Sequence, residues 1–416
     1  MILGAGTAGT VVANRLRAAI SRSDLRITVI DQNDEHNYQP GYVYRAFGRY
    51  TRRDVVRARH RLLADGIELI LTAIDRLWPQ AKQVELADGR LVDYDTLVIA
   101  TGISPRPDCV AGMTGSQFGK SVHQFYTLDG AEKLNQALRR FAGGRLVVQI
   151  CEFPIKCPVA PIEFALLADA WLRRRGLRGD TELTFVTPLD GVFTRPETLR
   201  QLGGLMPSRG IFVESDFVIE YVDNEAGEIV GYDGRRIGFD LLVTVPPNMG
   251  GDYIQRSGIG DELNLVQCDP YTMRALDLDD VYVLGDAGTL PTSKSGTVTH
   301  FSAEVFIENF LARWRARSSV RCQPERRFDG HSICFIDTGD RRAIMLDFNY
   351  ETPPLPGVFP LPVIGPVPLL RASYLSRRLK LGLAWYYWHM VLRGGRLPLP
   401  IDLIKAGKDV RGIPKA

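Results

Sequence analysis

Short apolar runs alternate with helical patterns along most of the chain. Buried strands are predicted where apolar residues follow one another without polar interruption, and helices where they recur every three or four positions. The predicted strands include ITVID (27–31), YDTLVIATG (94–102), RLVVQI (145–150), DLLVTVPP (240–247) and VYVLGDA (281–287), and the predicted helices include 162–172 and 303–314. Strands that alternate with helices indicate an α/β fold with parallel sheets.

Glycines stand between the first apolar residues and the first helix. Gly4, Gly6 and Gly9 form the pattern GxGxxG, and Asp31 ends the next strand, ITVID. A strand, glycines, a helix, a second strand and an acid follow one another in this order. The helix start can bind a pyrophosphate and the acid can accept a hydrogen bond from a ribose hydroxyl, so the segment predicts a dinucleotide site. Only Met1 to Leu3 precede the glycines, which leaves the position of the true start open.

Two later strand ends indicate which dinucleotide is bound. YDTLVIATG ends in Thr101 and Gly102, and VYVLGDA ends in Gly285 and Asp286. Together with the first glycines they match, in order, the three signatures of flavoproteins with two dinucleotide-binding domains, in which the last aspartate bonds the ribityl chain. The predicted cofactor is FAD.

The segment that normally binds NAD(P)H, roughly residues 116–240, keeps its strand pattern but has no second GxGxxG. We therefore predict two Rossmann-like domains, the second of them without a nucleotide fingerprint. The FAD-binding domain is discontinuous (1–115 and 241–320), the degenerate NAD-like domain is 116–240, and the remaining region is 321–416. Electrons must then reach the flavin from a donor other than a nicotinamide.

A cysteine occupies the turn where the second fingerprint would stand. Cys157 lies in the segment after the strand RLVVQI, where Lys156 precedes it and Pro158 follows it. Glu163 lies near the start of the next helix. A thiol at a helix N-terminus beside a cation is expected to have a lowered pKa and to be reactive. The alternative is a buried structural cysteine, and Glu163 could equally be a first-turn acid that complements the helix dipole.

Further candidates follow the last FAD signature. Thr292, Ser293 and Lys294 precede a helix and could face the pyrimidine edge of the flavin, although Ser293 could equally be a helix cap. Cys334 lies in the apolar run SICFIDTG (332–339), where a cysteine by itself is most often part of the core.

Composition excludes several classes of protein. The chain has 416 residues with 45% hydrophobic and 24% charged content, as expected for two or three globular domains. Its six cysteines are scattered and include no CxxC pair, so we expect neither a disulfide framework nor a metal site. No apolar run reaches the roughly 18 residues of a spanning helix, and no secretory signal precedes the first motif, so we expect a cytoplasmic compartment.

Charge is distributed unevenly. Residues 370–416 carry ten Lys or Arg against two acids, a net charge of +8. Because the net charge of the whole chain is +3, residues 1–369 carry −5.

Pro353–Leu370 is apolar but broken by prolines, so it cannot be a spanning helix. Behind it, a helical pattern places apolar residues on one side (Leu375, Leu379, Leu383, Tyr386, Tyr387 and Met390) and Arg377, Arg378 and Lys380 on the other, with Trp385 and Trp388 as aromatic anchors. This pattern predicts a helix at a membrane surface, and a dimer interface is the alternative. Nucleic acid is not expected as a partner.

The motifs together resemble one family. KCPVAP with Cys157, PTSK (291–294) and ICFIDTG with Cys334, set among FAD signatures without a second fingerprint, resemble the sulfide:quinone oxidoreductases, which are related to flavocytochrome c sulfide dehydrogenase. The resemblance covers essentially the whole chain. It implies that Cys157 and Cys334 flank the flavin, bridged by a disulfide or a sulfur chain, and that Glu163 is an acid near the sulfide-reacting cysteine.

One departure from the family concerns a third cysteine that many members have ahead of the second domain. Phe125 and Tyr126 occupy that stretch here, and Cys109 is not expected to replace it. The FAD should be non-covalent, because residues 1–108 contain no cysteine for the flavocytochrome's thioether. Type II NADH dehydrogenases share the architecture but need the missing second fingerprint.

The resemblance also implies a function. We expect oxidation of hydrogen sulfide to sulfane sulfur or polysulfide, with two electrons passed to a membrane quinone. Lys380 would lie near the quinone pocket, with Phe348 and Tyr350 lining it. The expected location is the cytoplasmic side of the cell membrane, as a peripheral protein, and a homo-oligomer is left open. The alternative is an FAD-dependent sulfide or persulfide dehydrogenase that uses a soluble acceptor such as a cytochrome c.

Overall fold

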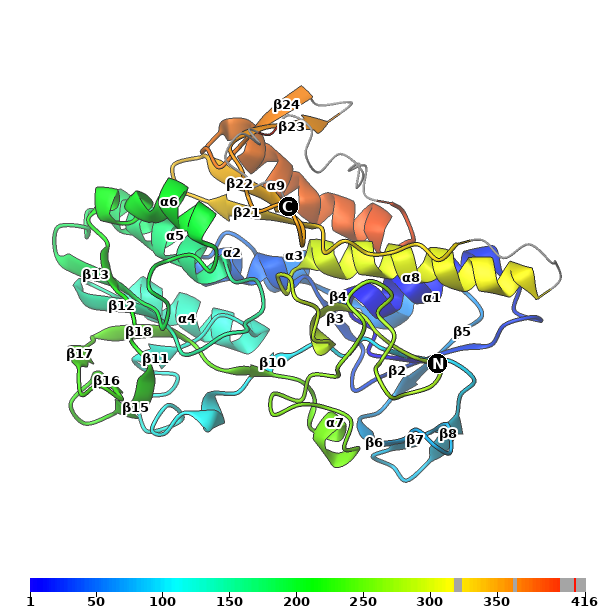
Figure 1. The fold of residues 1–416 in the computed structure, drawn as a ribbon. Helices are drawn as coiled ribbons and strands as arrows, with labels where there is room; N and C mark the ends of the chain where they lie inside the picture. Colours follow the sequence, from blue (N-terminus) through cyan, green and yellow to red (C-terminus); the bar gives the residue numbers. More distant parts are fainter. Residues whose placement is uncertain (318–323, 362–364, 397–407, 409–416) are drawn as a thin grey trace.

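The computed structural model describes residues 1–317, 324–361, 365–396 and 408. Two parallel sheets form its two main domains, and a third region lies above them in Figure 1. The first sheet has five strands in the order β20-β9-β1-β2-β5, namely Val281–Val283, Leu97–Ile99, Ile2–Leu3, Ile27–Asp31 and Ile67–Leu71. Strand β1 lies at its centre, with Ile2 paired to both Val29 and Val98.

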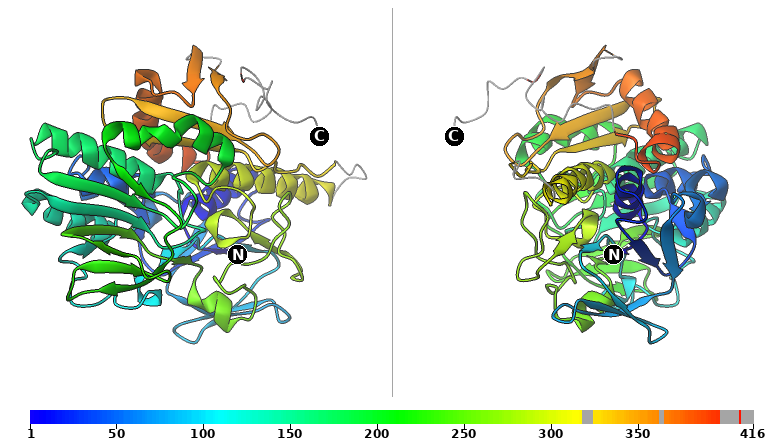
Figure 2. Two further views of the ribbon diagram at one scale, coloured as in Figure 1. Left: turned by 60° about the vertical axis from the view of Figure 1, so that its left-hand side comes forward. Right: turned by 90° about the vertical axis from the view of Figure 1, so that its right-hand side faces the viewer.

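Helices α1 (Thr7–Ala19) and α8 (Gly296–Ala316) pack against each other beside this sheet (Figure 1 and Figure 2). Because β1, β9 and β20 are parallel neighbours, the turns that follow them open at the same edge of the sheet. The three glycine-containing signatures therefore lie at one end of the first domain, although 281 residues separate Gly4 from Gly285.

The second sheet also has five parallel strands, in the order β11-β18-β12-β13-β14, namely Val122–His123, Leu241–Val245, Gly144–Ile150, Thr181–Val186 and Phe212–Glu214. Helices α4 (Leu128–Arg140) and α5 (Ala160–Arg174) belong to this domain. The expected boundary at residue 240 is too early. Strand β18 is fully buried and pairs with β11 on one side and β12 on the other. Its largely apolar sequence, interrupted only by Thr244, suits this central position.

The chain crosses between the two domains along a short antiparallel ribbon of β10 (Ser104–Pro105) and β19 (Asn248–Met249). Both domains also contain short helices: α2 (Tyr42–Ala46), α3 (Arg52–Val55), α6 (Pro196–Leu202) and α7 (Asp252–Arg256). Strands β3 (Glu35–Asn37) and β4 (Val56–Ala58) form a pair. Two antiparallel sheets have three strands each, β6-β7-β8 (Ile74–Trp78, Gln83–Leu86, Leu91–Asp93) and β15-β16-β17 (Ile219–Asp223, Glu228–Gly231, Arg236–Gly238).

The third region is a four-stranded sheet covered by helix α9 (Tyr374–Tyr386), which continues as a π-helical turn over Tyr387–Val391. Its strands have the order β21-β22-β24-β23, namely Ser332–Asp337, Ala343–Phe348, Gly365–Leu369 and Gly357–Leu361. The proline-rich segment thus contributes two strands, β23 and β24, and no helix. Among the described residues, no helix is long and apolar enough to cross a membrane.

Helix α9 differs from its expected orientation. Arg377 and Lys380 do not point to solvent, because they pair with the buried carboxylates of Asp337 and Glu163. Trp388 is also not a membrane anchor: it is only 3% exposed, and its ring nitrogen donates to the carbonyl of Asp54 over 3.1 Å. The exposed side of this helical segment instead carries Tyr374, Arg378, Trp385 and Met390.

Candidate active site

The glycine turn after β1 combines close packing with an open helix end. A Cβ atom on Gly9 would lie 1.9 Å from the carbonyl oxygen of Gly4, so only glycine fits there. A Cβ atom on Gly6 would meet nothing within 4 Å, and Gly6 precedes α1 without a side-chain cap. The free N–H groups of this helix start can therefore bind a pyrophosphate.

Asp31 lies beside this turn. Its Oδ2 atom accepts a hydrogen bond from the backbone of Ala5 at 2.7 Å and lies 2.9 Å from the guanidinium of Arg59. Arg59 also donates to the carbonyl of Ala5 over 2.6 Å, so the three residues form one group. Arg59 was not predicted, because it belongs to a single 3₁₀ turn outside any motif.

The third FAD signature is joined to the cysteine turn through Lys294. The ammonium of Lys294 donates to the carbonyls of Asp286 and Gly288 over 2.7 and 2.9 Å. The carbonyl of Lys294 accepts from the backbone N–H of Cys157 at 2.7 Å, and Lys156 forms a β-bridge with Lys294. The turn that carries Cys157 is therefore attached to the end of the FAD-binding domain.

Burial affects the ionisation of the charged groups here. It raises the pKa of Asp286, against the opposing charges of Lys294 and Lys156. Burial also lowers the pKa of Lys156 to about 8, an effect that Asp286 partly offsets. An open helix end, a constrained glycine turn and a basic group beside Asp286 fit a phosphate-bearing flavin cofactor. The residues expected to hold it are Gly4, Gly6, Gly9, Asp31, Thr101, Gly102, Gly285, Asp286 and Lys294.

Cys157 adopts a left-handed backbone conformation, with φ of 46°. Its carbonyl accepts from Ala160 at 2.8 Å, at the start of α5, and from the hydroxyl of Tyr126 at 3.3 Å. The stretch in which many family members have a third cysteine therefore touches Cys157 here through Tyr126. Cys109 is exposed, and its sulfur lies 3.8 Å from that of Met249.

The expectation of a lowered pKa for Cys157 is wrong. Burial raises the pKa of the Cys157 thiol to about 12, the charges of Cys334 and Glu163 raise it further, and Lys380 opposes them. Lys156 does not provide the expected stabilisation, because its ammonium interacts with Asp286. The thiol is therefore protonated at neutral pH when it is reduced.

Cys334 lies in β21 and is only 6% exposed. Burial raises its pKa, while the neighbouring hydroxyls of Ser332 and Ser293 lower it. Ser293 is not the helix cap, because Ser295 accepts from the backbone of Val298 at the start of α8. Cys334 also contributes to the raised pKa of Cys157, so the two cysteines, both unbridged in this structure, belong to one site.

Glu163 and Lys380 form a buried ion pair next to the two cysteines. Glu163 lies in the first turn of α5 and is 2% exposed, and its Oε2 atom is 2.5 Å from the Lys380 ammonium. Lys380 also donates to the carbonyl of Phe335 over 2.8 Å. The other carboxylate oxygen of Glu163 is buried without a hydrogen-bond partner among the described residues. Burial raises the pKa of Glu163, and Lys380 only partly opposes this.

A second buried acid beside this pair was not predicted. Asp337 accepts from the hydroxyl of Tyr44 at 3.0 Å and from Arg377 at 3.1 Å, and its charge contributes to the raised pKa of Glu163. The available signal was its position in the motif ICFIDTG, three residues after Cys334.

Phe348 and Tyr350 have surroundings different from those of Lys380. The guanidinium of Arg195 lies 4.7 Å from the centre of the Phe348 ring, and Phe348 is only 7% exposed. The hydroxyl of Tyr350 donates to the carbonyl of Pro270 over 2.9 Å. Their expected place beside the quinone stays a prediction.

Comparison with known proteins gives a consistent result. Residues 1–149 match the pyridine nucleotide-disulphide oxidoreductase family. The chain is 24% identical over 403 residues to the mitochondrial sulfide:quinone oxidoreductase of Mus musculus, covering 95% of this chain and 86% of that protein. It is 24% identical over 355 residues to the enzyme of the same name from Dictyostelium discoideum, covering 84% and 77%. The crystal structure of the sulfide:quinone oxidoreductase from Aquifex aeolicus has a TM-score of 0.76 at 18% identity, covering 95% of this chain and 91% of that one.

Proposed function

Because the chain belongs to the FAD-dependent sulfide:quinone oxidoreductase family, we propose that it oxidises hydrogen sulfide and passes two electrons to a membrane quinone. The observation that carries the proposal is the convergence of Cys157, from the second domain, and Cys334, from the third region, beside the FAD-binding turns. The β12–α5 turn that would hold a nicotinamide cofactor is occupied by Cys157 instead.

The cysteines provide the reaction with sulfide. Hydrosulfide attacks a disulfide between Cys157 and Cys334, which forms one S–S bond, breaks another and leaves a persulfide on one cysteine and a thiolate on the other. Bound FAD supplies the two-electron acceptor. The positive charge of Lys380 stabilises a thiolate at Cys157, because it partly opposes the rise in pKa that burial causes. Glu163, with its raised pKa, is suited to hold a proton beside the cysteines.

Lys380 also connects this site with the surface at which a quinone would arrive. It lies on α9, whose opposite side exposes Trp385 (62%) and Tyr374 (56%) together with Arg378, and Met390 (42%) is exposed in the π-helical turn that follows. Aromatic and basic residues on one exposed face are typical of a helix that lies on a membrane. We infer a peripheral protein on the cytoplasmic side of the cell membrane, with the quinone near Lys380, Phe348 and Tyr350.

Anaerobic flavin spectroscopy tests the function. Sulfide should bleach the flavin of the purified protein and decylubiquinone should restore it, while NADH leaves it oxidised. Bleaching by NADH would contradict the proposal. If cytochrome c restores the colour and decylubiquinone does not, the acceptor is soluble and the quinone assignment is wrong.

A further inference from the structure

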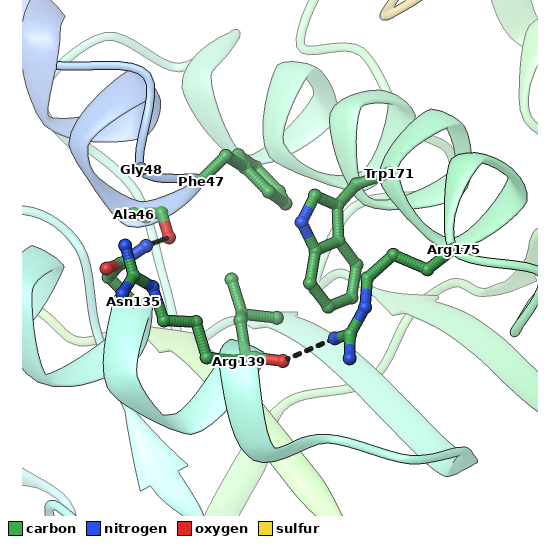
Figure 3. A pocket seen from close by; sticks show the side chains of 8 residues that line it. Ala46, Phe47, Gly48, Asn135, Arg139, Trp171 and Arg175 are labelled. Atoms are coloured by element: carbon green, nitrogen blue, oxygen red, sulfur yellow. Dashed lines mark hydrogen bonds between the residues drawn. The ribbon is translucent and has the colours of Figure 1, made fainter.

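A cavity of about 340 Å³ lies where the first and second domains meet, and no cysteine lines it (Figure 3). Residues from α2 and its end, from α4 and from α5 line it: Ala46, Phe47, Gly48, Asn135, Leu138, Arg139, Trp171 and Arg175. Its volume is within the roughly 300–1,000 Å³ of small-molecule sites, which often lie between domains. None of these residues has a role in the proposed reaction.

The lining contains two arginines and no carboxylate. The guanidinium of Arg175 donates to the carbonyls of Leu138 and Phe141 over 3.1 and 3.4 Å. Arg139 is exposed, and within the described part of the chain no acid pairs with it. The neighbouring Arg45 is paired with Glu132 at 3.5 Å. Arg139 therefore provides an uncompensated positive charge at the cavity.

Aromatic and apolar groups lie beside these charges. The rings of Phe47 and Trp171 are 6.3 Å apart, and the guanidinium of Arg175 lies 4.6 Å from the centre of the Trp171 ring. Asn135 donates to the carbonyl of Ala46 over 2.8 Å, which joins α4 to the end of α2. In Figure 3, Arg139 lies on the Asn135 side and Arg175 on the Trp171 side.

We propose that this cavity binds a small aromatic carboxylate. Its carboxylate pairs with Arg139, because the planar guanidinium matches carboxylate geometry and has no competing acid. Its ring lies against the half-buried Trp171, where aromatic contact adds affinity. A neutral aromatic molecule would leave Arg139 unpaired, and inorganic phosphate would not use the rings.

Calorimetric titration of the FAD-loaded protein with 2-naphthoate tests the proposal. We expect saturable binding that Arg139→Gln weakens about tenfold or more, the loss of one charge-assisted contact. Arg140→Gln is the matched control, because Arg140 is the next residue on α4, is exposed and does not line the cavity. Its affinity for 2-naphthoate should equal that of the wild type.

Two further ligands separate the contributions. The neutral 2-naphthalenemethanol and inorganic phosphate should each bind the wild type with an affinity at least about tenfold lower than that of 2-naphthoate. The proposal is overturned if 2-naphthoate shows no saturable binding, if Arg139→Gln and Arg140→Gln bind it equally, or if either further ligand binds as tightly. Thermal unfolding of both variants confirms that they are folded.

Discussion

Lys380 and Glu163 are 217 residues apart in the sequence, yet their charged groups lie 2.5 Å from each other in a buried environment. Glu163 belongs to the helix that follows the Cys157 turn, and Lys380 to the helix whose outer face is exposed. The ion pair therefore joins the cysteine site to the region proposed to meet the membrane.

Replacing Lys380 should destabilise the protein in a pH-dependent way. Lys380→Met leaves the Glu163 carboxylate buried without a cation, and breaking a buried pair costs about 3–5 kcal/mol. Burial already raises the pKa of Glu163 above its ordinary value, and the substitution raises it further. Because the folded-state pKa is raised, stability is retained at low pH and is lost as pH rises through that pKa. The loss in unfolding free energy should be larger near about pH 8 than near about pH 5.

Chemical denaturation at both pH values measures this effect. Arg378→Met is the control, since Arg378 is exposed on the same helix and should show no pH-dependent loss. An equal loss at both pH values for Lys380→Met would show that Glu163 is not the group left unpaired.

Reduced Cys157 should react slowly with iodoacetamide at neutral pH. Its pKa is raised to about 12, so the thiolate fraction should grow about tenfold per pH unit between about pH 7 and 9. Mass spectrometry of the Cys157 peptide, with the exposed Cys109 peptide as a monitor of the reagent, gives the rate. A rate that levels off near neutral pH would restore the lowered pKa that the sequence suggested.

The two tryptophans of the C-terminal helix should behave in opposite ways. Trp388→Ala removes a side chain that is 3% exposed and should lower the unfolding free energy by about 3–5 kcal/mol. Trp385→Ala changes a side chain that is 62% exposed, so it should leave stability unchanged and weaken binding to vesicles with anionic lipid. Denaturation and vesicle flotation of both variants compare them directly. Unaltered flotation of Trp385→Ala would argue against this face as the membrane contact and favour a dimer interface, which sedimentation would detect.

Substitutions in the first glycine turn should separate folding from FAD binding. Gly6→Val places its side chain in open space, so the polypeptide should keep its stability but lose FAD. Gly9→Ala places a methyl group 1.9 Å from the carbonyl oxygen of Gly4 and should destabilise the fold itself. Thermal unfolding of the FAD-free proteins and the ratio of bound flavin to protein distinguish the two effects. FAD retention by Gly6→Val at wild-type level would contradict the assigned pyrophosphate position.

The parts of the fold that the sequence predicted are those that depend on neighbouring residues. Gly4 and Gly285 could be recognised because each signature consists of a strand, a tight turn and the start of the next element. Parallel pairing then brings the strand ends together. Ser293 shows the limit of such reasoning, because a cap two residues later, Ser295, could be identified only from the hydrogen bond it makes.

Features that depend on distant parts of the chain could not be predicted in the same way. Lys156 adjoins Cys157 in the sequence, but its charge interacts with Asp286, and burial determines the pKa of the thiol. The helical pattern around Trp388 correctly indicated a helix, yet periodicity does not reveal which surface the helix contacts. The same holds for Lys380, whose position on the polar side of the pattern suggested solvent rather than Glu163.

The most direct test of the central claim is anaerobic reduction of the flavin by sulfide in Cys157→Ser and Cys334→Ser, with Cys109→Ser as the control. If the two cysteines form the entry for electrons from sulfide, both variants should bind FAD normally and stay oxidised, while the control bleaches as fast as the wild type. Flavin reduction at the wild-type rate in either Cys157→Ser or Cys334→Ser would contradict the account.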